Sequence, residues 1–371
     1  MKQSQNPQNL DLLIVLPSLH AGGTERVASI LSNCWTAEHY SVVVVCTESS
    51  ENIHYSLDPR IVVMEALQPW AKRLRPIPGL TSALVVCSIF HLIRTRQPAR
   101  ILSFLPGPNI LTLLAGMPLG KKIIISERNH LEHRKIPWIW RKLRRLTYPK
   151  ALKIIINLEA NRDLLARWVD ERKIVSLPNP ISVKRLKPSS DRRENTLLAV
   201  GRLTKQKAYH LLLTAFAQSE CRSSDWRLVI IGEGDEKARL NVALDSLDIR
   251  DQVTMISVSD DIWAEYQKHK YFVMPSMFEG TPNSLLEAVA CGMIPIVSDG
   301  VGDIADGIRN IEPRLVFPVN QVDRLVEILN LICGPSKLQY EVPDSSHQII
   351  APFLLKHSLP RWTAEVFGAD E

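Results

Sequence analysis

The chain has few of the patterns by which metal, cofactor and disulfide-rich proteins are identified. Its 371 residues contain six cysteines, but these form no CxxC pair and no metal-ligand spacing, so we expect reduced thiols in the core. They are Cys34, Cys46, Cys87, Cys221, Cys291 and Cys333. No cluster of His, Asp and Glu has metal spacing, and no DxD pair ends a predicted strand. The sequence therefore predicts no metal site and no bound cofactor.

Long apolar runs are also missing. The longest, 81–93, is too short to span a bilayer and includes His91, and the first ten residues are too polar for a signal peptide. No GxGxxG motif is present, and no acidic residue ends the second predicted strand, which argues against a nicotinamide cofactor. We therefore expect a cytoplasmic protein without a transmembrane helix.

The charge is unevenly distributed along a chain that is too long for one typical domain. Residues 1–185 hold 26 Lys and Arg against 13 Asp and Glu, whereas residues 186–371 hold 19 against 26. This asymmetry suggests that the first half meets an anionic partner. A basic solvated surface is the alternative.

Short β-branched runs alternate with helix-length segments in two series. The first series predicts strands at 12–16, 41–46, 61–64, 100–103, 122–126, 151–156 and 173–177. The second predicts strands at 196–200, 227–231, 253–256, 271–274, 294–297 and 315–317. The alternation indicates an α/β protein with two Rossmann-like parallel sheets, each covered by helices. Ligands bind at the carboxyl ends of such strands, so we expect the two domains to face a central cleft.

A segment rich in proline and charge separates the two series. The sequences LPNP at 177–180 and KPSSDRREN at 187–195 are typical of an interdomain linker. We predict an N-terminal domain over 1–182, a second domain over 183–340 and a tail over 341–371. The tail contains a possible helix at 345–356 that packs back on either domain.

The most informative stretch is FEGTPNSLLEA at 278–288, where two carboxylates lie eight residues apart. Thr281 is expected to cap a helix and Pro282 to occupy its first turn, so that Glu279 precedes the helix and Glu287 lies inside it. Backbone N–H groups at the start of this helix point outward at its positive end. They belong to Asn283, Ser284 and Leu285. This arrangement suits a phosphate flanked by hydroxyl groups, as in a nucleotide sugar.

Glycines and basic residues follow other strands. In GRLTKQK at 201–207, Arg202 and Lys207 are candidates to hold a diphosphate, although two exposed residues on a turn are an equal alternative. Gly22 and Gly23 allow a ligand to approach the backbone, or form a plain strand-to-helix turn. The segment IGEGD at 231–235 is expected to form a tight turn.

The run SERNH at 126–130 follows another predicted strand. Glu127 or His130 is a candidate for proton transfer, and Arg128 is a candidate for binding phosphate. A buried salt bridge between Glu127 and Arg128 is an equally good interpretation.

A dense positive charge accompanies two tryptophans at 133–146. Such a helix suits an anionic membrane surface, and 70–75 is expected to extend the patch. Nucleic-acid binding is a rival, but no nucleic-acid motif accompanies it, and a solvated helix with buried tryptophans is the remaining alternative. The predicted membrane patch comprises Trp138, Trp140, Arg141, Lys142, Arg144 and Arg145.

Together these stretches resemble the retaining, nucleotide-sugar-dependent glycosyltransferases of family 4, which have the GT-B fold. Residues 275–298 resemble the E-x7-E region of that family, and 201–207 resemble its Arg/Lys diphosphate motif. AGGTE at 21–25 resembles its N-terminal glycine loop, and LPNPI at 177–181 its hinge. The resemblance covers about residues 10–335.

The resemblance implies roles for individual residues. Arg202 and Lys207 would bind the donor diphosphate near the N–H of Gly23, and Glu279 would contact the transferred sugar. Glu287 would bind the ribose hydroxyls, and the N–H groups of residues 283–285 would act as donors. The base would lie near Ile256 and Ser257.

The chain departs from the family at three places. Ala208 and Ser257 stand where glycine is usual, and Arg128 occupies the place of a common histidine, with His130 two residues on. The SERN run resembles bacterial members that extend lipid-linked oligosaccharides. The resemblance therefore implies transfer of a hexose or N-acetylhexosamine from a UDP-sugar to a polyprenyl-diphosphate-linked saccharide, on the inner face of the cytoplasmic membrane. A soluble enzyme with a small acceptor and a catalytically silent membrane-bound scaffold are the alternatives.

Overall fold

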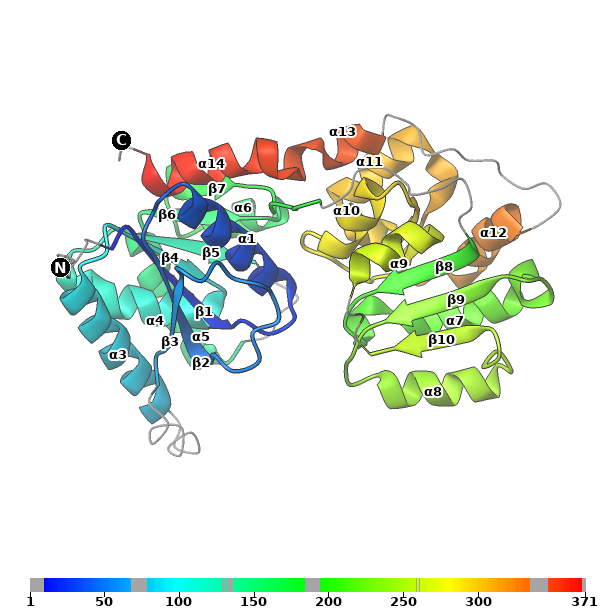
Figure 1. Ribbon diagram of the computed structural model, residues 1–371, viewed down its shortest axis with the longest axis horizontal. Coiled ribbons are helices and arrows are strands. Elements are labelled where there is room, and N and C mark those ends of the chain that lie inside the picture. The colour runs from blue at the N-terminus through cyan, green and yellow to red at the C-terminus, as the bar shows by residue number, and fades with distance from the viewer. Residues whose placement is uncertain are drawn as a thin grey trace, which may run out of the picture. The chain divides into compact units, whose positions relative to one another are not determined.

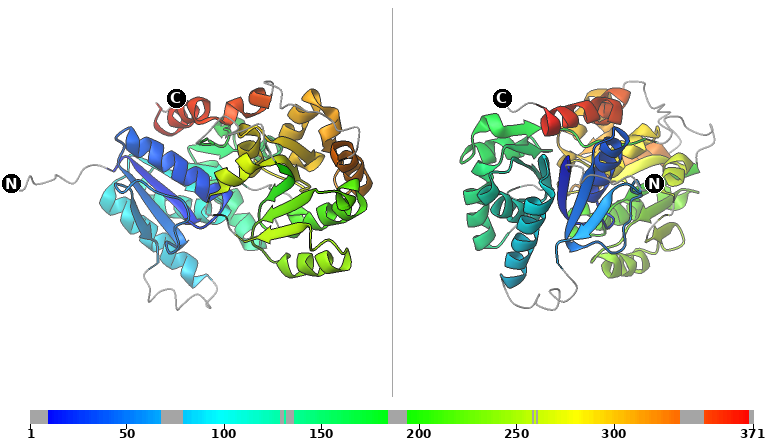
Figure 2. Two further views of the ribbon diagram at one scale, coloured as in Figure 1. Left: turned by 45° about the vertical axis from the view of Figure 1, so that its right-hand side comes forward. Right: turned by 60° about the vertical axis from the view of Figure 1, so that its left-hand side comes forward.

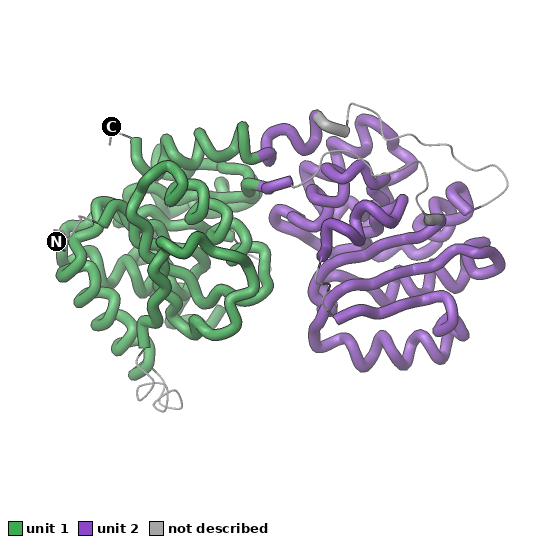
Figure 3. The backbone as a smooth tube through the Cα atoms, viewed as in Figure 1, with its two compact units in different colours: residues 1–180, 355–371 green, residues 181–354 purple. Residues whose placement is uncertain are grey.

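The structure is a computed structural model that describes residues 10–67, 79–128, 131, 136–183, 194–257, 259, 261–333 and 346–368. The chain forms two compact units (Figure 3). Unit 1 comprises residues 1–180 and 355–371, and unit 2 comprises residues 181–354. The N-terminal and C-terminal segments of the chain therefore belong to the same unit.

Unit 1 contains a seven-stranded parallel sheet with the order β3-β2-β1-β4-β5-β6-β7. Its strands are β1 (Leu12–Ser18), β2 (Val42–Ser49), β3 (Val62–Glu65), β4 (Arg100–Phe104), β5 (Ile123–Glu127), β6 (Lys153–Ile156) and β7 (Ile174–Ser176). Its helices are α1 (Gly23–Ala37), α3 (Leu80–Arg96), α4 (Pro106–Gly116), α5 (Trp138–Thr147), α6 (Ala160–Ala166) and α14 (Leu355–Phe367).

Alternate residues of the central strands of unit 1 enter two different cores. Leu13 and Val15 of β1 join the core that contains side chains of α3 and α4. Leu12 and Ile14 join the opposite core, which contains side chains of α1 and α14. The sheet is thus covered on both faces (Figures 1 and 2), which explains why its strands are almost entirely apolar.

Unit 2 contains a six-stranded parallel sheet with the order β10-β9-β8-β11-β12-β13. Its strands are β8 (Glu194–Val200), β9 (Arg227–Ile231), β10 (Val253–Ile256), β11 (His269–Met274), β12 (Ile294–Ser298) and β13 (Val316–Phe317). Its helices are α7 (Tyr209–Gln218), α8 (Lys237–Ser246), α9 (Ile262–Lys268), α10 (Asn283–Ala290), α11 (Asp303–Ile311), α12 (Val322–Cys333) and α13 (Ser346–Ile350).

Short 3-10 turns connect several of these elements. They are η1 (Met117–Leu119), η2 (Tyr148–Lys150), η3 (Glu171–Lys173), η4 (Lys205–Lys207), η5 (Glu220–Ser223), η6 (Asp299–Val301), η7 (Pro313–Leu315) and η8 (Ala351–Phe353). The prediction of one helix over 345–356 is wrong, because α13 ends at Ile350 and α14 begins at Leu355. Pro352 lies between them in η8, and a proline cannot donate the hydrogen bond that would continue a helix.

The two predicted parallel sheets are confirmed, and each predicted strand has a counterpart. In both sheets the strand order reverses next to the first strand, between β1 and β4 in unit 1 and between β8 and β11 in unit 2. Ligands of doubly wound sheets bind at this switch point. The segment 201–207 follows β8 and the segment 275–283 follows β11, so both motifs lie at the switch point of unit 2.

The prediction of reduced core thiols is wrong for three of the six cysteines. Cys221 on η5 and Cys333 at the end of α12 form a disulfide with their Cα atoms 5.4 Å apart, and Cys87 is exposed. Because 112 residues separate the paired cysteines, their spacing gave no sign of the bond.

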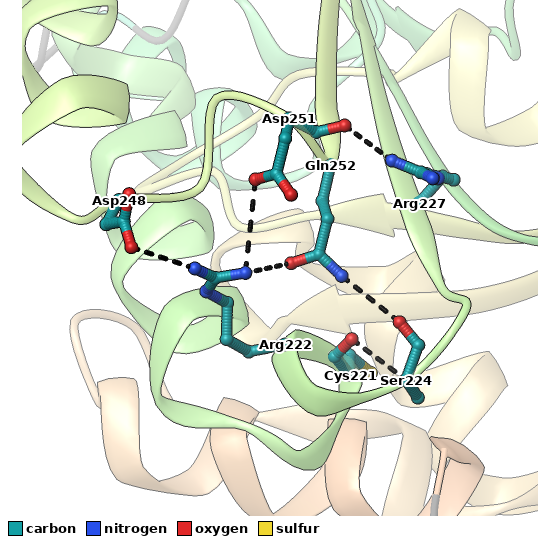
Figure 4. Close-up of polar contacts among 7 residues, drawn as sticks. All are labelled: Cys221, Arg222, Ser224, Arg227, Asp248, Asp251 and Gln252. Atoms are coloured by element: carbon teal, nitrogen blue, oxygen red, sulfur yellow. Dashed lines mark hydrogen bonds and ion pairs between the residues drawn. The ribbon is translucent and has the colours of Figure 1, made fainter.

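Hydrogen bonds also hold η5 to the loop before β10 (Figure 4). Arg222 donates to Gln252 Oε1 at 2.8 Å and to Asp248 Oδ2 at 3.1 Å.

In the described part of the chain, no helix is both long enough and apolar enough to cross a bilayer.

Candidate active site

Lys207 and Glu279 meet at the carboxyl edge of the sheet in unit 2. Lys207 Nζ lies 2.7 Å from Glu279 Oε1, and the two side chains are only 13% and 9% exposed. The residues follow the neighbouring strands β8 and β11. Because little water surrounds the pair, its charges are weakly screened and act strongly on any group that enters between the two loops.

The Lys207 side chain extends across Gly201. A Cβ atom at Gly201 would lie 2.9 Å from Lys207 Cε and 2.8 Å from the Tyr209 hydroxyl, so only glycine leaves room for both. Burial raises the pKa of Tyr209 well above its ordinary value, and the charge of Glu279 raises it further. Tyr209 therefore remains a neutral phenol beside the ion pair.

Hydrogen bonds join the two loops that carry this pair. Met277 N donates to the Gln206 carbonyl oxygen, and Gln206 Nε2 donates to the Phe278 carbonyl oxygen, both at 2.8 Å. Glu279 N donates to the Gly300 carbonyl oxygen at 2.9 Å, and Ser284 Oγ donates to the carbonyl oxygen of Val200 at 3.0 Å. The position of the ion pair thus follows from backbone contacts as well as from charge.

The predicted tight turn after β9 is confirmed, and it supports the loop after β8 from behind. Leu203 N donates to the Glu233 carbonyl oxygen at 2.8 Å, and Gly232 N donates to the Ile256 carbonyl oxygen at 2.8 Å. A Cβ atom at Gly232 would lie 1.9 Å from the Gly201 carbonyl oxygen. The ends of β8, β9 and β10 are therefore packed so closely that a side chain at residue 232 would not fit.

Helix α10 begins one residue later than expected. Asn283 is its first residue and Pro282 takes the N-cap position, so the prediction that Thr281 is the N-cap residue is wrong. A proline before the first turn is tolerated because the helix needs no N–H there. Glu287 lies inside the helix as predicted, is 1% exposed, and accepts a hydrogen bond from the Tyr266 hydroxyl at 3.1 Å.

The other residues predicted for the donor line the same edge. The Arg202 side chain is exposed and makes no ion pair within the described residues. Ile256 ends β10, and Ser257 Oγ accepts a hydrogen bond from Lys237 Nζ at 2.8 Å. Lys237 also lies 2.9 Å from Glu233 Oε1, and the hydrogen bond of Glu233 to Ser257, followed by that to Lys237, lowers the pKa of Glu233.

In unit 1, Gly22 takes the N-cap position of α1. A Cβ atom at Gly22 would lie 2.1 Å from Glu25 Oε2, so the Glu25 carboxylate occupies the space that a side chain at residue 22 would need. A side chain at residue 22 would therefore require the flexible Glu25 carboxylate to move, and this contact was not expected from the sequence. Gly23 is the first residue of the helix.

Arg128 follows β5 in unit 1 and is 8% exposed. Its Nη2 donates to Asn179 Oδ1, while its Nη1 has no hydrogen-bond partner among the described residues. Burial lowers the pKa of Arg128 to about 10, and the charge of Glu25 opposes that change. The salt bridge considered between Glu127 and Arg128 does not occur in the described part of the structure; Glu127 accepts a hydrogen bond from Tyr148 instead.

Some predicted residues lie outside the described residues. They are His130 and the parts of the basic patch at 70–75 and 133–135. The prediction of proton transfer by His130 therefore stays a prediction.

Helix α5 carries the rest of the predicted basic patch. Trp140 packs against the core of unit 1, whereas Trp138 is 60% exposed, so the prediction of two surface tryptophans is correct for one of them. Ile139 and Leu146 are also exposed, at 45% and 69%. Arg141, Lys142 and Arg145 are exposed on the same helix, and Arg144 is half-buried.

Three residues in or next to these loops were not expected from the sequence. Tyr209 begins an ordinary apolar helical run, Asn179 was considered only as part of a hinge, and Glu25 was considered only as part of a glycine loop. A signal existed for Glu25, because an acidic residue in the first turn is favoured by the positive end of a helix. No comparable signal identifies Tyr209 or Asn179.

Within the described residues, no group of three or more His, Cys, Asp or Glu side chains could hold a metal ion. Arg202 and Lys207 are two of the cations at this edge of unit 2. That the reaction needs no metal ion stays a prediction.

Two family models match the chain. The model of glycosyl transferases group 1 matches residues 182–339, and the model of glycosyltransferase family 4 matches residues 21–185. The two matches together span both units and include the loops after β1, β8 and β11.

Similar proteins include two enzymes of Campylobacter jejuni. The first is the GalNAc-α-(1→4)-GalNAc-α-(1→3)-diNAcBac-PP-undecaprenol α-1,4-N-acetyl-D-galactosaminyltransferase, 25% identical over 95% of this chain and 97% of the relative. The second is the N-acetylgalactosamine-N,N'-diacetylbacillosaminyl-diphospho-undecaprenol 4-α-N-acetylgalactosaminyltransferase, 27% identical over 88% of this chain and 91% of the relative.

Among solved structures, Anabaena Alr3699/HepE in complex with UDP is similar in fold, with a TM-score of 0.76. It is 14% identical, and the match covers 96% of this chain and 99% of that chain. The chain therefore belongs to the family 4, group 1 glycosyltransferases, and it is a glycosyltransferase with the GT-B fold.

Proposed function

We propose that the protein transfers a hexose or N-acetylhexosamine from a UDP-sugar, with retention at the anomeric carbon, to a polyprenyl-diphosphate-linked saccharide. The observation that carries the donor half of this proposal is the Lys207–Glu279 ion pair at the switch point of unit 2. An ammonium suits a diphosphate, and a carboxylate suits sugar hydroxyl groups. The UDP complex of the similar Anabaena protein supports the same donor class.

Departure of UDP places negative charge on the β-phosphate as the glycosidic bond breaks. Lys207 and the exposed Arg202 would stabilise this charge more strongly in the transition state than in the ground state, which is the requirement for catalysis. Glu279 would hold the sugar, and Glu287 would hold the ribose. Retention would follow from attack of the acceptor hydroxyl on the face that the diphosphate leaves.

The acceptor half of the proposal rests on the two Campylobacter jejuni relatives and on α5. Both relatives are named for undecaprenol-linked saccharides. The exposed Trp138, Ile139 and Leu146, next to Arg141, Lys142 and Arg145, suit the headgroup region of an anionic membrane. We therefore place the enzyme at the inner face of the cytoplasmic membrane, as a peripheral protein.

A donor and acceptor screen tests the proposal. Purified protein would be incubated with a panel of UDP-sugars and synthetic undecaprenyl-diphosphate saccharides, and products would be identified by mass spectrometry. A product heavier by one hexose or N-acetylhexosamine is expected. Transfer only to small water-soluble acceptors would contradict the proposal, and absence of binding to any nucleotide sugar would favour a catalytically silent scaffold.

Flotation with anionic liposomes tests the membrane surface separately. Replacement of Trp138, Ile139 and Leu146 by alanine is expected to reduce the floating fraction several-fold. The matched control is Val242→Ala, which removes an apolar side chain that is 68% exposed on α8 of unit 2. Equal flotation of wild type, the triple alanine variant and Val242→Ala would contradict the assignment of α5.

A further inference from the structure

We propose that Tyr148 and Glu127 form a clamp that positions Arg128 to bind the diphosphate of the acceptor. This inference rests on the proposed function, because it assigns Arg128 to the acceptor and not to the donor. Tyr148 and Glu127 are positioning residues in this account, and Arg128 is the residue that contacts the ligand.

The clamp joins three elements of unit 1. Tyr148 is the first residue of η2, directly after α5, and its hydroxyl donates to Glu127 Oε2 at 2.8 Å. Asn109 of α4 donates from Nδ2 to the Tyr148 hydroxyl at 3.3 Å and to the Ser126 carbonyl oxygen at 3.1 Å. All four side chains are fully buried. A buried carboxylate is costly unless it accepts hydrogen bonds, so the Tyr148 hydroxyl anchors the end of β5.

Arg128 is the next residue after this anchor. Its guanidinium is 8% exposed, and Asn179 accepts from Nη2 while Nη1 has no partner among the described residues. A buried guanidinium with an unused donor is unfavourable in isolation. A phosphate that accepts from Nη1 would complete its hydrogen bonds, because the planar guanidinium matches phosphate geometry.

The acceptor is favoured as the source of that phosphate for two reasons. The proposed function already assigns the donor diphosphate to Lys207 and Arg202 in unit 2. Tyr148 directly follows α5, whose exposed side chains suit the membrane in which a polyprenyl chain lies. One hydroxyl group thus connects the end of the lipid-facing helix to the loop that carries Arg128.

A double-mutant cycle tests the clamp. Acceptor and donor KM values would be measured for wild type, Tyr148→Phe, Arg128→Ala and the double variant. Tyr148→Phe keeps the ring and removes the hydrogen bond to the Glu127 carboxylate together with the longer one from Asn109, so we expect the acceptor KM to rise about tenfold and the donor KM to stay within about twofold. In the Arg128→Ala background, Tyr148→Phe should add less than about twofold.

The matched control is Tyr40→Phe, in the same unit, where the ring stacks on Phe367. It should leave both KM values unchanged. Additive effects of Tyr148→Phe and Arg128→Ala, or a rise in the donor KM alone, would overturn the clamp. Should Tyr148→Phe prove insoluble, Glu127→Gln replaces it in the cycle, since it weakens the same hydrogen bond with almost no change in volume; the same non-additivity is expected.

The two proposals fail in different ways. If wild type accepts no polyprenyl-diphosphate saccharide, the proposed acceptor is wrong, and the cycle is then measured by calorimetry with inorganic diphosphate and, separately, UDP. The clamp would be supported if Tyr148→Phe weakens diphosphate binding in the wild-type background but has no further effect in the Arg128→Ala background. Equal diphosphate affinity of wild type and Tyr148→Phe would overturn it.

Discussion

Lys207 Nζ lies 2.7 Å from Glu279 Oε1, and this ion pair joins the two sequence motifs that favour a nucleotide-sugar donor. A diphosphate that approaches Lys207 competes with Glu279 for the ammonium. Exchange of one partner for the other would free the carboxylate for the hydroxyl groups of the sugar. The ion pair would therefore be a resting arrangement that donor binding rearranges.

Lys207→Ala and Glu279→Ala are each expected to lower kcat by about 10²- to 10³-fold, the usual effect of removing one charge-stabilising group. Circular dichroism should show an intact fold. The matched control is Lys205→Ala, an exposed lysine of the same loop, which should retain activity. Turnover at the wild-type rate by either of the first two variants would refute the site.

Gly232→Ala is expected to lower the free energy of unfolding by about 1–3 kcal/mol, because its Cβ would lie 1.9 Å from the Gly201 carbonyl oxygen. It should also weaken UDP binding, since the loop of Lys207 must move. Gly107→Ala in α4 is the control: nothing lies within 4 Å of its Cβ, so a gain of about 0.5–1 kcal/mol is expected. Denaturant unfolding would measure both, and equal stability of the two variants would contradict the packing described for Gly232.

Alkylation with iodoacetamide at pH 8 should separate the cysteines by environment. Burial, followed by the charges of Glu65 and Glu25, raises the pKa of Cys46 to about 12, so almost no thiolate exists at pH 8 and no labelling is expected. The exposed Cys87 should be labelled. Rapid labelling of Cys46 in the folded protein would show that it is not buried.

The same mass map tests the disulfide. Peptides that contain Cys221 and Cys333 should be recovered as one linked species, and reduction should destabilise unit 2 by about 2–5 kcal/mol because the bond closes a long loop. A thermal-unfolding scan with and without reductant would detect this change. Full labelling of both thiols without prior reduction would show that the bond is absent in solution.

EDTA is expected to leave transfer unchanged, because Arg202 and Lys207 are proposed to neutralise the diphosphate. Initial rates would be measured after dialysis against EDTA, with added Mg²⁺ as the comparison. A strict requirement for Mg²⁺ would show that these two cations are insufficient.

The sheets were predictable because buried parallel strands are marked by β-branched runs, such as the segment of β2. The order of the motifs along the chain also identified which loops follow which strands. Glu279 was correctly placed before a helix and Glu287 inside it, because an apolar helical face begins at Leu285.

Contacts between distant segments were not predictable from one sequence. The Tyr209 hydroxyl and the Lys207 side chain both lie against Gly201, which has no side chain, and the disulfide depends on packing of η5 against α12. The N-cap position falls at Pro282 and not at Thr281 for a local reason, since both residue types are acceptable at a helix start. Ala208, which stands where the resemblance predicts glycine, has a positive φ of 52°, a conformation that is less favourable for alanine than for glycine.

The central claim is that unit 2 binds the diphosphate of a nucleotide sugar through its own cations. A crystal structure of the protein with UDP tests this most directly. We expect the diphosphate against Lys207 and Arg202, with the ribose hydroxyl groups on Glu287 and the base near Ser257. UDP bound anywhere else on the protein, with the Lys207–Glu279 ion pair undisturbed, would contradict the account.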